Sequence, residues 1–228
     1  MSEVPIVRLA GVSKEFGSGE TVVHALRDIG LEIGKGEFVT LAGPSGSGKS
    51  TLLNVIGGLD RPSTGTVEIE GNDLGKLGGT ALSLLRRKRI GFIFQAYNLI
   101  PVLTALENAE YVLLLQGVPA VERRRRILEL FERVGLSGLQ DRFPREMSGG
   151  QQQRVAIVRA VVSEPALVLA DEPTANVDSK TGGALMDMMS HMNAEHRVTF
   201  LFSTHDPRVI ERAGRRVVLR DGVIDKGG

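Results

Sequence analysis

The sequence predicts an α/β protein built around a mostly parallel β-sheet, with a β-rich first third and a helical segment inserted in the middle. Apolar runs at residues 37–42, 166–170 and 198–202 are typical of buried strands, and helix-like segments lie between them. Strands that alternate with helices indicate a parallel sheet. Between about Thr80 and Val162 the pattern is helical instead, which predicts a separate helical lobe.

The first third contains the segments with the strongest strand character. Residues 6–9, 22–33 and 37–42 are apolar runs separated by turn residues. Residues 65–71 alternate polar and apolar side chains between two glycines, as a strand with one buried face does. We therefore expect this third to be mostly β-structure.

The middle and last thirds supply the helices and the remaining strands. Within residues 121–134, apolar side chains recur at the i, i+3, i+4 and i+7 positions of one helix face. These side chains are Ile127, Leu130, Phe131 and Val134. Residues 179–193 form a further helix-like segment, and residues 216–225 are strand-like with the Asp221-Gly222 pair at an expected hairpin turn.

The chain has no internal repeat, low-complexity tract or Pro-rich linker within its 228 residues. We therefore expect a single domain that spans residues 1–228. Residues 1–95 and 163–228 would form its core, and residues 96–162 the inserted helical subdomain.

The composition excludes several classes of function. The formal net charge is +1, from 28 Lys and Arg against 27 Asp and Glu, so no bulk charge favours nucleic acid as a partner. Because the chain has no cysteine, it has no disulfide, no thiolate zinc site and no cysteine nucleophile. No apolar run approaches the roughly 18 to 20 residues of a membrane-spanning helix.

A glycine-rich segment follows the apolar run at residues 37–42 and precedes a helix-like segment. It consists of Gly43, Pro44, Ser45, Gly46, Ser47, Gly48, Lys49 and Ser50, and it fits the pattern G-x-x-x-x-G-K-[ST]. Strand, loop and helix in this order place backbone N–H groups around phosphate oxygens at the start of a helix. Lys49 would reach the β- and γ-phosphates, and the hydroxyl of Ser50 would bind Mg²⁺.

Charged side chains end two other predicted strands. Asp171 and Glu172 follow residues 166–170, and His205 follows residues 198–202. The carboxyl ends of parallel strands meet at one edge of a sheet, where ligands bind. Asp171 could hold Mg²⁺ through water and Glu172 could polarise an attacking water, although a solvated strand end would carry the same residues. The remaining histidines, His24, His191 and His196, are expected to be ordinary residues.

A second glycine motif comprises Ser148, Gly149, Gly150 and Gln151, directly before the helix-like residues 152–162. Ser148 is suited to cap that helix, and its exposed N–H groups would form a second anion site. A capped helix without a ligand is the simpler interpretation. One chain does not need two phosphate cradles about 100 residues apart, so a site completed by a second copy of the chain is the economical explanation.

In this order the motifs resemble the ATP-binding cassette (ABC) subunits of membrane transporters, over nearly the whole chain. Residues 43–50 resemble Walker A, Gln95 the Q-loop, residues 148–151 the signature, residues 167–172 Walker B, Asn176-Val177-Asp178 the D-loop and His205 the switch histidine. The resemblance implies a P-loop NTPase core with a mostly parallel sheet, an N-terminal antiparallel β subdomain and an inserted α-helical subdomain.

The resemblance also implies that the chain binds and hydrolyses ATP with Mg²⁺. The implied catalytic residues are Glu172, His205 and Gln95, and the implied metal residues are Ser50, Gln95 and Asp171. The implied nucleotide contacts are Phe16, residues 43–51 including Thr51, the four signature residues and Asp178.

The partners that the resemblance implies are a second copy of the chain and an integral membrane permease. Two copies would form a head-to-tail dimer that holds ATP between Walker A of one subunit and the signature of the other. The chain would then be cytoplasmic and peripheral on the inner face of the cell membrane, with no nucleic-acid partner.

Within this family, residues 43–54, 98–101 and 170–176 are most similar to subunits of lipoprotein-release and macrolide-export systems. Met147, Val177 and Phe16 depart from the usual Leu, Leu and Tyr, and all three exchanges stay apolar or nearly isosteric. The alternative is a membrane-coupled, non-transport ATPase of the cell-division type. A DNA-repair relative is disfavoured because residues 95–148 lack the sustained heptads of a coiled coil.

Residues 96–106 follow Gln95 and are mostly uncharged. They include Leu99 and Leu103, and they contain more apolar side chains than a solvent-facing loop usually exposes. They are expected to form either part of the core or a groove that receives a short helix of the permease.

Overall fold

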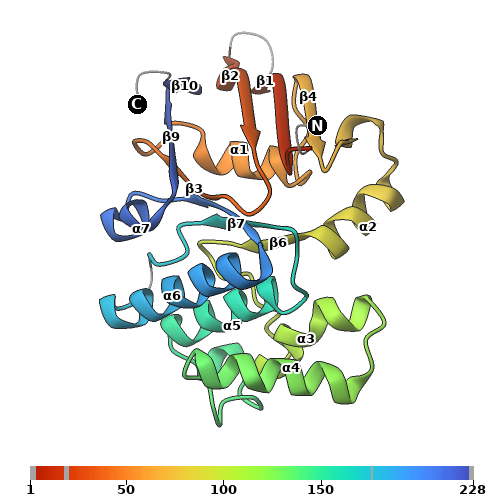
Figure 1. Ribbon diagram of the computed structural model, residues 1–228, viewed down its shortest axis with the longest axis vertical. Coiled ribbons are helices and arrows are strands. Elements are labelled where there is room, and N and C mark those ends of the chain that lie inside the picture. Colours follow the sequence, from red (N-terminus) through yellow and green to blue (C-terminus); the bar gives the residue numbers. More distant parts are fainter. Residues whose placement is uncertain (1–3, 18–20, 176, 226–228) are drawn as a thin grey trace.

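The computed structural model describes residues 4–17, 21–175 and 177–225, and it has the predicted α/β architecture. Figure 1 shows the antiparallel strands at one end of the molecule, the parallel strands in the middle and a group of helices at the other end. The described residues form two sheets with the strand orders β2-β1-β4-β5 and β10-β9-β3-β8-β7-β6.

The first sheet is antiparallel and belongs to the N-terminal third of the chain. Its strands are β1 (Val7–Phe16), β2 (Val23–Ile33), β4 (Thr64–Ile69) and β5 (Asn72–Asp73). The pairing of β1 with β2 runs from Val7 opposite Ile33 to Phe16 opposite Val23. β1 is longer than the predicted residues 6–9, and its second half pairs with β2.

The second sheet is parallel except for the β9–β10 pair. Its strands are β3 (Phe38–Ala42), β6 (Ile90–Ile93), β7 (Leu167–Asp171), β8 (Thr199–Ser203), β9 (Arg215–Arg220) and β10 (Val223–Asp225). The predicted turn at Asp221-Gly222 connects β9 and β10, and both of its residues have a positive φ. β3, β7 and β8 are almost entirely buried because both faces of this sheet are covered.

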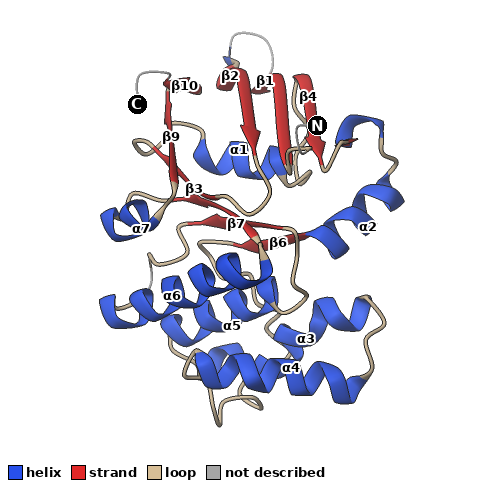
Figure 2. Ribbon diagram, in the orientation of Figure 1, coloured by secondary structure: helices blue, strands red, loops and turns tan. Residues whose placement is uncertain are grey.

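Each face of the parallel sheet has its own hydrophobic core. Leu167 and Leu169 of β7 pack in the core shared with the antiparallel sheet. Val168 and Ala170 of the same strand pack in the core formed with the helices. In Figure 2, α1 accordingly lies on one side of β3 and β7, and α5 and α6 lie on the other.

The helices follow the predicted segments closely. They are α1 (Lys49–Ile56), α2 (Gly79–Arg89), α3 (Ala105–Leu115), α4 (Ala120–Arg133), α5 (Gly149–Val161), α6 (Ser179–His196) and α7 (Pro207–Arg212), with short 3-10 turns at Leu74–Lys76 and Pro144–Glu146. Ile127 and Phe131 of α4 are fully buried, as the helical spacing predicts. Within the described residues, no helix has both the length and the apolar character that a membrane span requires.

The segment from about Thr80 to Val162, whose pattern is helical, also contains a strand and connecting loops. Strand β6 interrupts it and pairs in parallel with β7, from Ile90 opposite Leu167 to Ile93 opposite Ala170. A four-residue apolar run cannot be assigned to helix or strand by periodicity, and here pairing with β7 decides.

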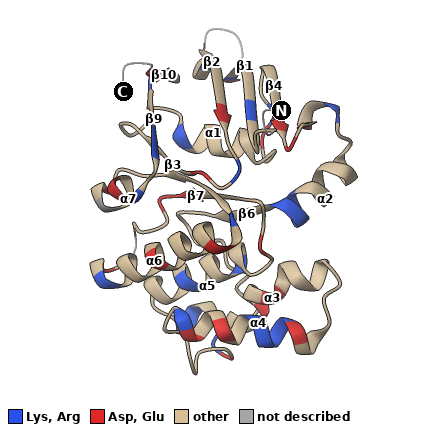
Figure 3. Cartoon of the chain, viewed as in Figure 1, with Lys and Arg blue, Asp and Glu red and all other residues tan. Residues whose placement is uncertain are grey.

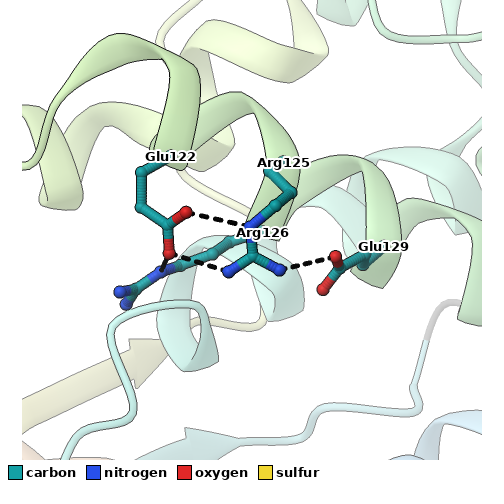
Figure 4. A network of polar contacts seen from close by, with 4 residues as sticks. All are labelled: Glu122, Arg125, Arg126 and Glu129. Atoms are coloured by element: carbon teal, nitrogen blue, oxygen red, sulfur yellow. Dashed lines mark hydrogen bonds and ion pairs between the residues drawn. The ribbon is translucent and has the colours of Figure 1, made fainter.

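The arginine run of α4, residues 123–126, forms ion pairs within the helix and, through Arg123 and Glu110, with α3. Figure 3 shows basic and acidic residues following one another along α4. Arg125 bonds Glu122 and Glu129, and Arg126 bonds Glu122, at 2.7–2.8 Å (Figure 4). These hydrogen bonds from Arg125 and Arg126 lower the pKa of Glu122 to about 2. The run is therefore a charged helix face whose partners lie in the same chain.

A glycine in β6 allows α5 to pack closely on the sheet. A Cβ added to Gly91 would lie 2.2 Å from the backbone oxygen of Ala160 in α5. We predict that Gly91→Ala lowers the free energy of unfolding by about 2 kcal/mol or more, since helix and strand must separate. Urea denaturation measures this effect.

Gly183→Ala is the matched control, because Gly183 lies inside α6 and an added Cβ there meets nothing within 4 Å. This variant should be unchanged or slightly more stable, since alanine favours helix. Equal stability of the two variants would contradict the close contact at Gly91.

Candidate nucleotide site

The phosphate loop connects the end of β3 to the start of α1. A Cβ at Gly43 would lie 2.0 Å from the carbonyl oxygen of Leu219, and a Cβ at Gly48 would lie 2.4 Å from that of Ala25. Gly48 also has a φ of 100°, which side chains rarely tolerate. Both glycines therefore let the loop press against neighbouring strands, which fixes its path.

Lys49 lies at the first position of α1 and folds back over the loop. Its Nζ donates hydrogen bonds of 2.8 Å to the backbone oxygens of Gly43 and Pro44. The ammonium group is thus held at the loop that would surround phosphates, close to the N-terminus of a helix.

The loop forms one wall of a cavity of about 690 Å³. The wall contains all the predicted loop residues from Gly43 to Thr51 except Ser47, whose side chain is buried beneath the loop. The other lining residues are Val23, His24, Ala25, Gln95, Asp171, Glu172, Ser203 and His205. The fold thus brings Gln95, the acid pair and the histidine to the phosphate loop.

The acid pair lies where β7 ends. Asp171 is the last residue of the strand and lies opposite Ser203 of β8. At Glu172 the backbone turns into the left-handed region, with a φ of 48°, and its N–H donates to the oxygen of Ser203 at 2.8 Å. A non-glycine residue in this conformation costs about 1 kcal/mol, which the surrounding contacts must offset.

The carboxylate of Glu172 has a partner on each oxygen. Its Oε1 lies 2.7 Å from Nδ1 of His205, and its Oε2 accepts a hydrogen bond of 3.3 Å from the hydroxyl of Thr204. The side chain of Glu172 is 13% exposed and that of His205 is 78% exposed. The mostly buried carboxylate of Glu172 therefore contacts the ring of His205, which is mostly exposed to solvent.

The oxygen-bearing side chains in the cavity suit a magnesium ion. Ser50, Gln95 and Asp171 line the same wall and offer a hydroxyl, an amide oxygen and a carboxylate. Mg²⁺ prefers such hard oxygen ligands and usually shares substrate phosphates with one or two carboxylates. No group of three or more His, Cys, Asp or Glu residues forms a metal cluster in the described ranges.

Phe16 and Asp178, like the signature residues, are predicted nucleotide contacts that do not line this cavity. Phe16 is 44% exposed at the end of β1, and the ammonium of Lys14 lies 4.8 Å from its ring centre. It is opposite Val23, which does line the cavity, so Phe16 lies near the rim. The D-loop residue Asn176 falls outside the described residues.

Asp178 instead caps α6, and its carboxylate accepts a hydrogen bond of 3.0 Å from the N–H of Thr181. Hydrogen bonds from the side chain and the backbone of Thr181 lower the pKa of Asp178. Asp178, an expected nucleotide contact, does not line this chain's own cavity.

The second glycine motif is a capped helix start, separate from the cavity. Ser148 Oγ accepts from the N–H of Gln151, and the side chain of Gln151 accepts from the N–H of Ser148, which together form a capping box. Ser148 is exposed, and none of the four motif residues lines the cavity. The parallel sheet separates α1, which carries the phosphate loop, from α5, which carries this motif (Figure 1).

Part of the cavity lining comes from residues that belong to none of the predicted motifs. His24, expected to be an ordinary residue, lies on the wall together with its neighbours Val23 and Ala25, and its Nδ1 is 3.0 Å from a carboxylate oxygen of Glu15. Ser203 also lines the wall. These residues arrive through strand pairing, which leaves no local signature in the sequence.

The fold and the site define an ATPase of the phosphate-loop class. A family model described as ABC transporter matches residues 26–175. The chain therefore belongs to the ABC transporter family, as an ATP-binding and ATP-hydrolysing subunit.

Similar proteins align in sequence with almost the whole chain. A macrolide export ATP-binding/permease protein, MacB 1/2 of Paracoccus denitrificans, is 49% identical over 96% of this chain but only 33% of its own length. An ABC transporter ATP-binding protein of Thermotoga maritima is 46% identical over 96% of this chain and 94% of its own length. This chain thus spans about a third of the MacB relative and nearly all of the other.

A solved structure gives the same fold. The dimeric cassette MJ0796 of Methanocaldococcus jannaschii, in a post-hydrolysis state bound to ADP and Pi, superposes with a TM-score of 0.92. It is 43% identical in sequence, and the match covers 96% of this chain and 97% of that one.

We predict that Lys49→Ala weakens ATP binding more than ten-fold, because the charge beside the β- and γ-phosphates is lost. Titration calorimetry with ATP and Mg²⁺ measures the dissociation constant. Lys76→Ala is the control, since Lys76 is 83% exposed and pairs only with nearby Asp73 at 3.0 Å. Unchanged ATP binding by Lys49→Ala would show that the phosphate loop is not part of the nucleotide site.

Proposed function

We infer that the chain is the ATP-driven motor of a membrane transporter of the export or lipoprotein-release type, and that it works as a head-to-tail homodimer. The carrying observation is the exposed, capped start of α5, which offers N–H groups to an anion but lies off the chain's own cavity. In the proposed dimer, the start of α5 binds the γ-phosphate that the phosphate loop of the second copy holds.

The relatives support this proposal. MJ0796 forms a dimer in its solved structures, and the name of the MacB relative combines an ATP-binding part with a permease. In the proposal, residues 1–228 act as one domain, and residues 96–162 act as a helical subdomain that moves when the dimer closes. The permease holds the motor at the cytoplasmic face of the membrane.

The chemistry assigns one role to each group in the cavity. Glu172 accepts a proton from the attacking water, and His205 orients Glu172 and the γ-phosphate region. Ser50, Asp171 and Gln95 would hold Mg²⁺, and the ion would supply positive charge beside the phosphates. Lys49 and the loop N–H groups bind the β- and γ-phosphates.

We predict that Glu172→Gln lowers ATP turnover by roughly 10² or more while ATP binding survives, because the amide keeps the shape and loses the basicity. With ATP this variant should accumulate as a dimer on a sizing column. Steady-state ATPase assays and light scattering measure both effects.

Glu164→Gln is the matched control for this substitution. Glu164 also has a left-handed backbone, with a φ of 48°, but it precedes β7 and is exposed. The control should hydrolyse ATP at the normal rate and stay unaffected in its assembly. Normal turnover in Glu172→Gln would assign the base to another residue.

The surface proposed for the permease is the loop between Gln95 and α3. Leu99 and Leu103 are half-buried, and Leu99 packs against the helical core. The buried amide of Asn108 accepts from the N–H of Ile100 at 2.7 Å and donates to the oxygens of Ile100 and Leu103 at 3.0–3.1 Å. The loop is therefore held firmly while Val102, which is 79% exposed, projects from it.

We predict that Val102→Glu abolishes co-purification with the permease, because a charge must be buried at the contact, while basal ATPase activity and folding stay normal. Val121→Glu is the control, since Val121 is 86% exposed on α4 of the same lobe. Co-purification measures the effect. Retained permease binding by Val102→Glu would place the docking surface elsewhere.

A further inference from the structure

Thr204 is a fully buried polar residue directly beside Glu172. It lies between Ser203 and His205, yet unlike both it does not line the cavity. Its backbone N–H donates to the carbonyl oxygen of Leu41 in β3 at 3.3 Å. Because β3 leads into the phosphate loop, Thr204 is anchored to the strand that carries the loop.

The hydrogen bonds of Thr204 fix the direction of its hydroxyl proton. The N–H of Asp206 donates to Thr204 Oγ1 at 3.0 Å, so the oxygen acts as an acceptor there. A threonine hydroxyl has only one proton. That proton is then directed to Oε2 of Glu172, 3.3 Å away.

The two partners of the Glu172 carboxylate differ in their freedom to move. His205 is mostly exposed, so solvent and an arriving phosphate compete for its ring. Thr204 is shielded from solvent and tied to β3 and to Asp206. His205 can exchange partners during a cycle, whereas Thr204 keeps the carboxylate plane in place.

We propose that Thr204 is a positioning residue that fixes the Glu172 carboxylate relative to the phosphate loop through its hydroxyl. This inference rests on the proposed role of Glu172 as the base. The hydroxyl sets the direction in which the carboxylate meets the attacking water, and small errors in such alignment slow a reaction strongly. Nucleotide binding is unaffected, because Thr204 does not reach the cavity.

The test compares Thr204→Val, which removes the hydroxyl with little change of volume, with Thr204→Ser, which retains it. Thr204→Val should lower kcat roughly ten-fold, the size of one hydrogen bond to a charged group, with KM and ATP affinity unchanged. Thr204→Ser should restore kcat to within about two-fold of the normal value. If Thr204→Val does not fold, Thr204→Ala replaces it in the comparison.

Thr199→Val is the matched control for a general loss of stability. Thr199 is also fully buried at β8, and its Oγ1 accepts a hydrogen bond of 2.9 Å from the N–H of Gly36, away from the cavity. This variant loses a comparable bond and should retain a normal kcat. An equal fall of kcat in Thr199→Val would show that Thr204 acts only through stability and would overturn the proposal.

The Glu172→Gln background separates this proposal from the proposed function. Adding Thr204→Val to Glu172→Gln should leave the residual turnover unchanged, because the carboxylate that Thr204 aligns is already gone. A further ten-fold fall in the double variant, or a normal kcat in Thr204→Val alone, would overturn the role of Thr204 while Glu172 remained the base. Normal turnover in Glu172→Gln itself would instead overturn the assignment of the base.

Discussion

The parallel pairing of β3, β8 and β7 is the constraint on which the site depends. In this register Leu41 lies opposite Ser203, and Ser203 lies opposite Asp171. The three strands therefore end side by side. Residues that are distant in the sequence, the phosphate loop, the acid pair and His205, meet at one carboxyl edge because of this register. A shift by one residue in any of these pairs would move Glu172 away from the phosphate loop.

The same sheet keeps the start of α1, which follows the phosphate loop, apart from the start of α5, which follows Ser148. Its faces are covered by two separate cores, one with α1 and the antiparallel sheet and one with α5 and α6. The phosphate loop is therefore on one side and the signature motif on the other. Gly91 brings α5 close to the sheet, and Ser148 at the start of α5 does not line the cavity. The proposed dimer follows from this geometry.

Glu172 combines an unfavourable backbone conformation with hydrogen bonds that hold it in place. Glu172 has a left-handed backbone, its N–H bonds Ser203, and its carboxylate contacts Thr204 and His205. Ser203 is the last residue of β8, and Thr204 and His205 follow it directly. Such a residue is retained only where its surroundings over-determine its position. Glu172, His205 and the strand that carries the phosphate loop are thus connected through hydrogen bonds.

The sequence by itself determined the chemistry and most of the elements. The phosphate loop, the acid pair at a strand end and the cap at Ser148 are local patterns, because each needs only a few neighbouring residues and a turn or helix start. The folded chain was needed to show that Ile90–Ile93 pairs with β7, that Phe16 lies outside the cavity lining while His24 belongs to it, and that Thr204 contacts Glu172. Those outcomes depend on pairing between strands that are far apart in the chain. Such pairing is selected by burial of whole sheet faces, and no short segment records it.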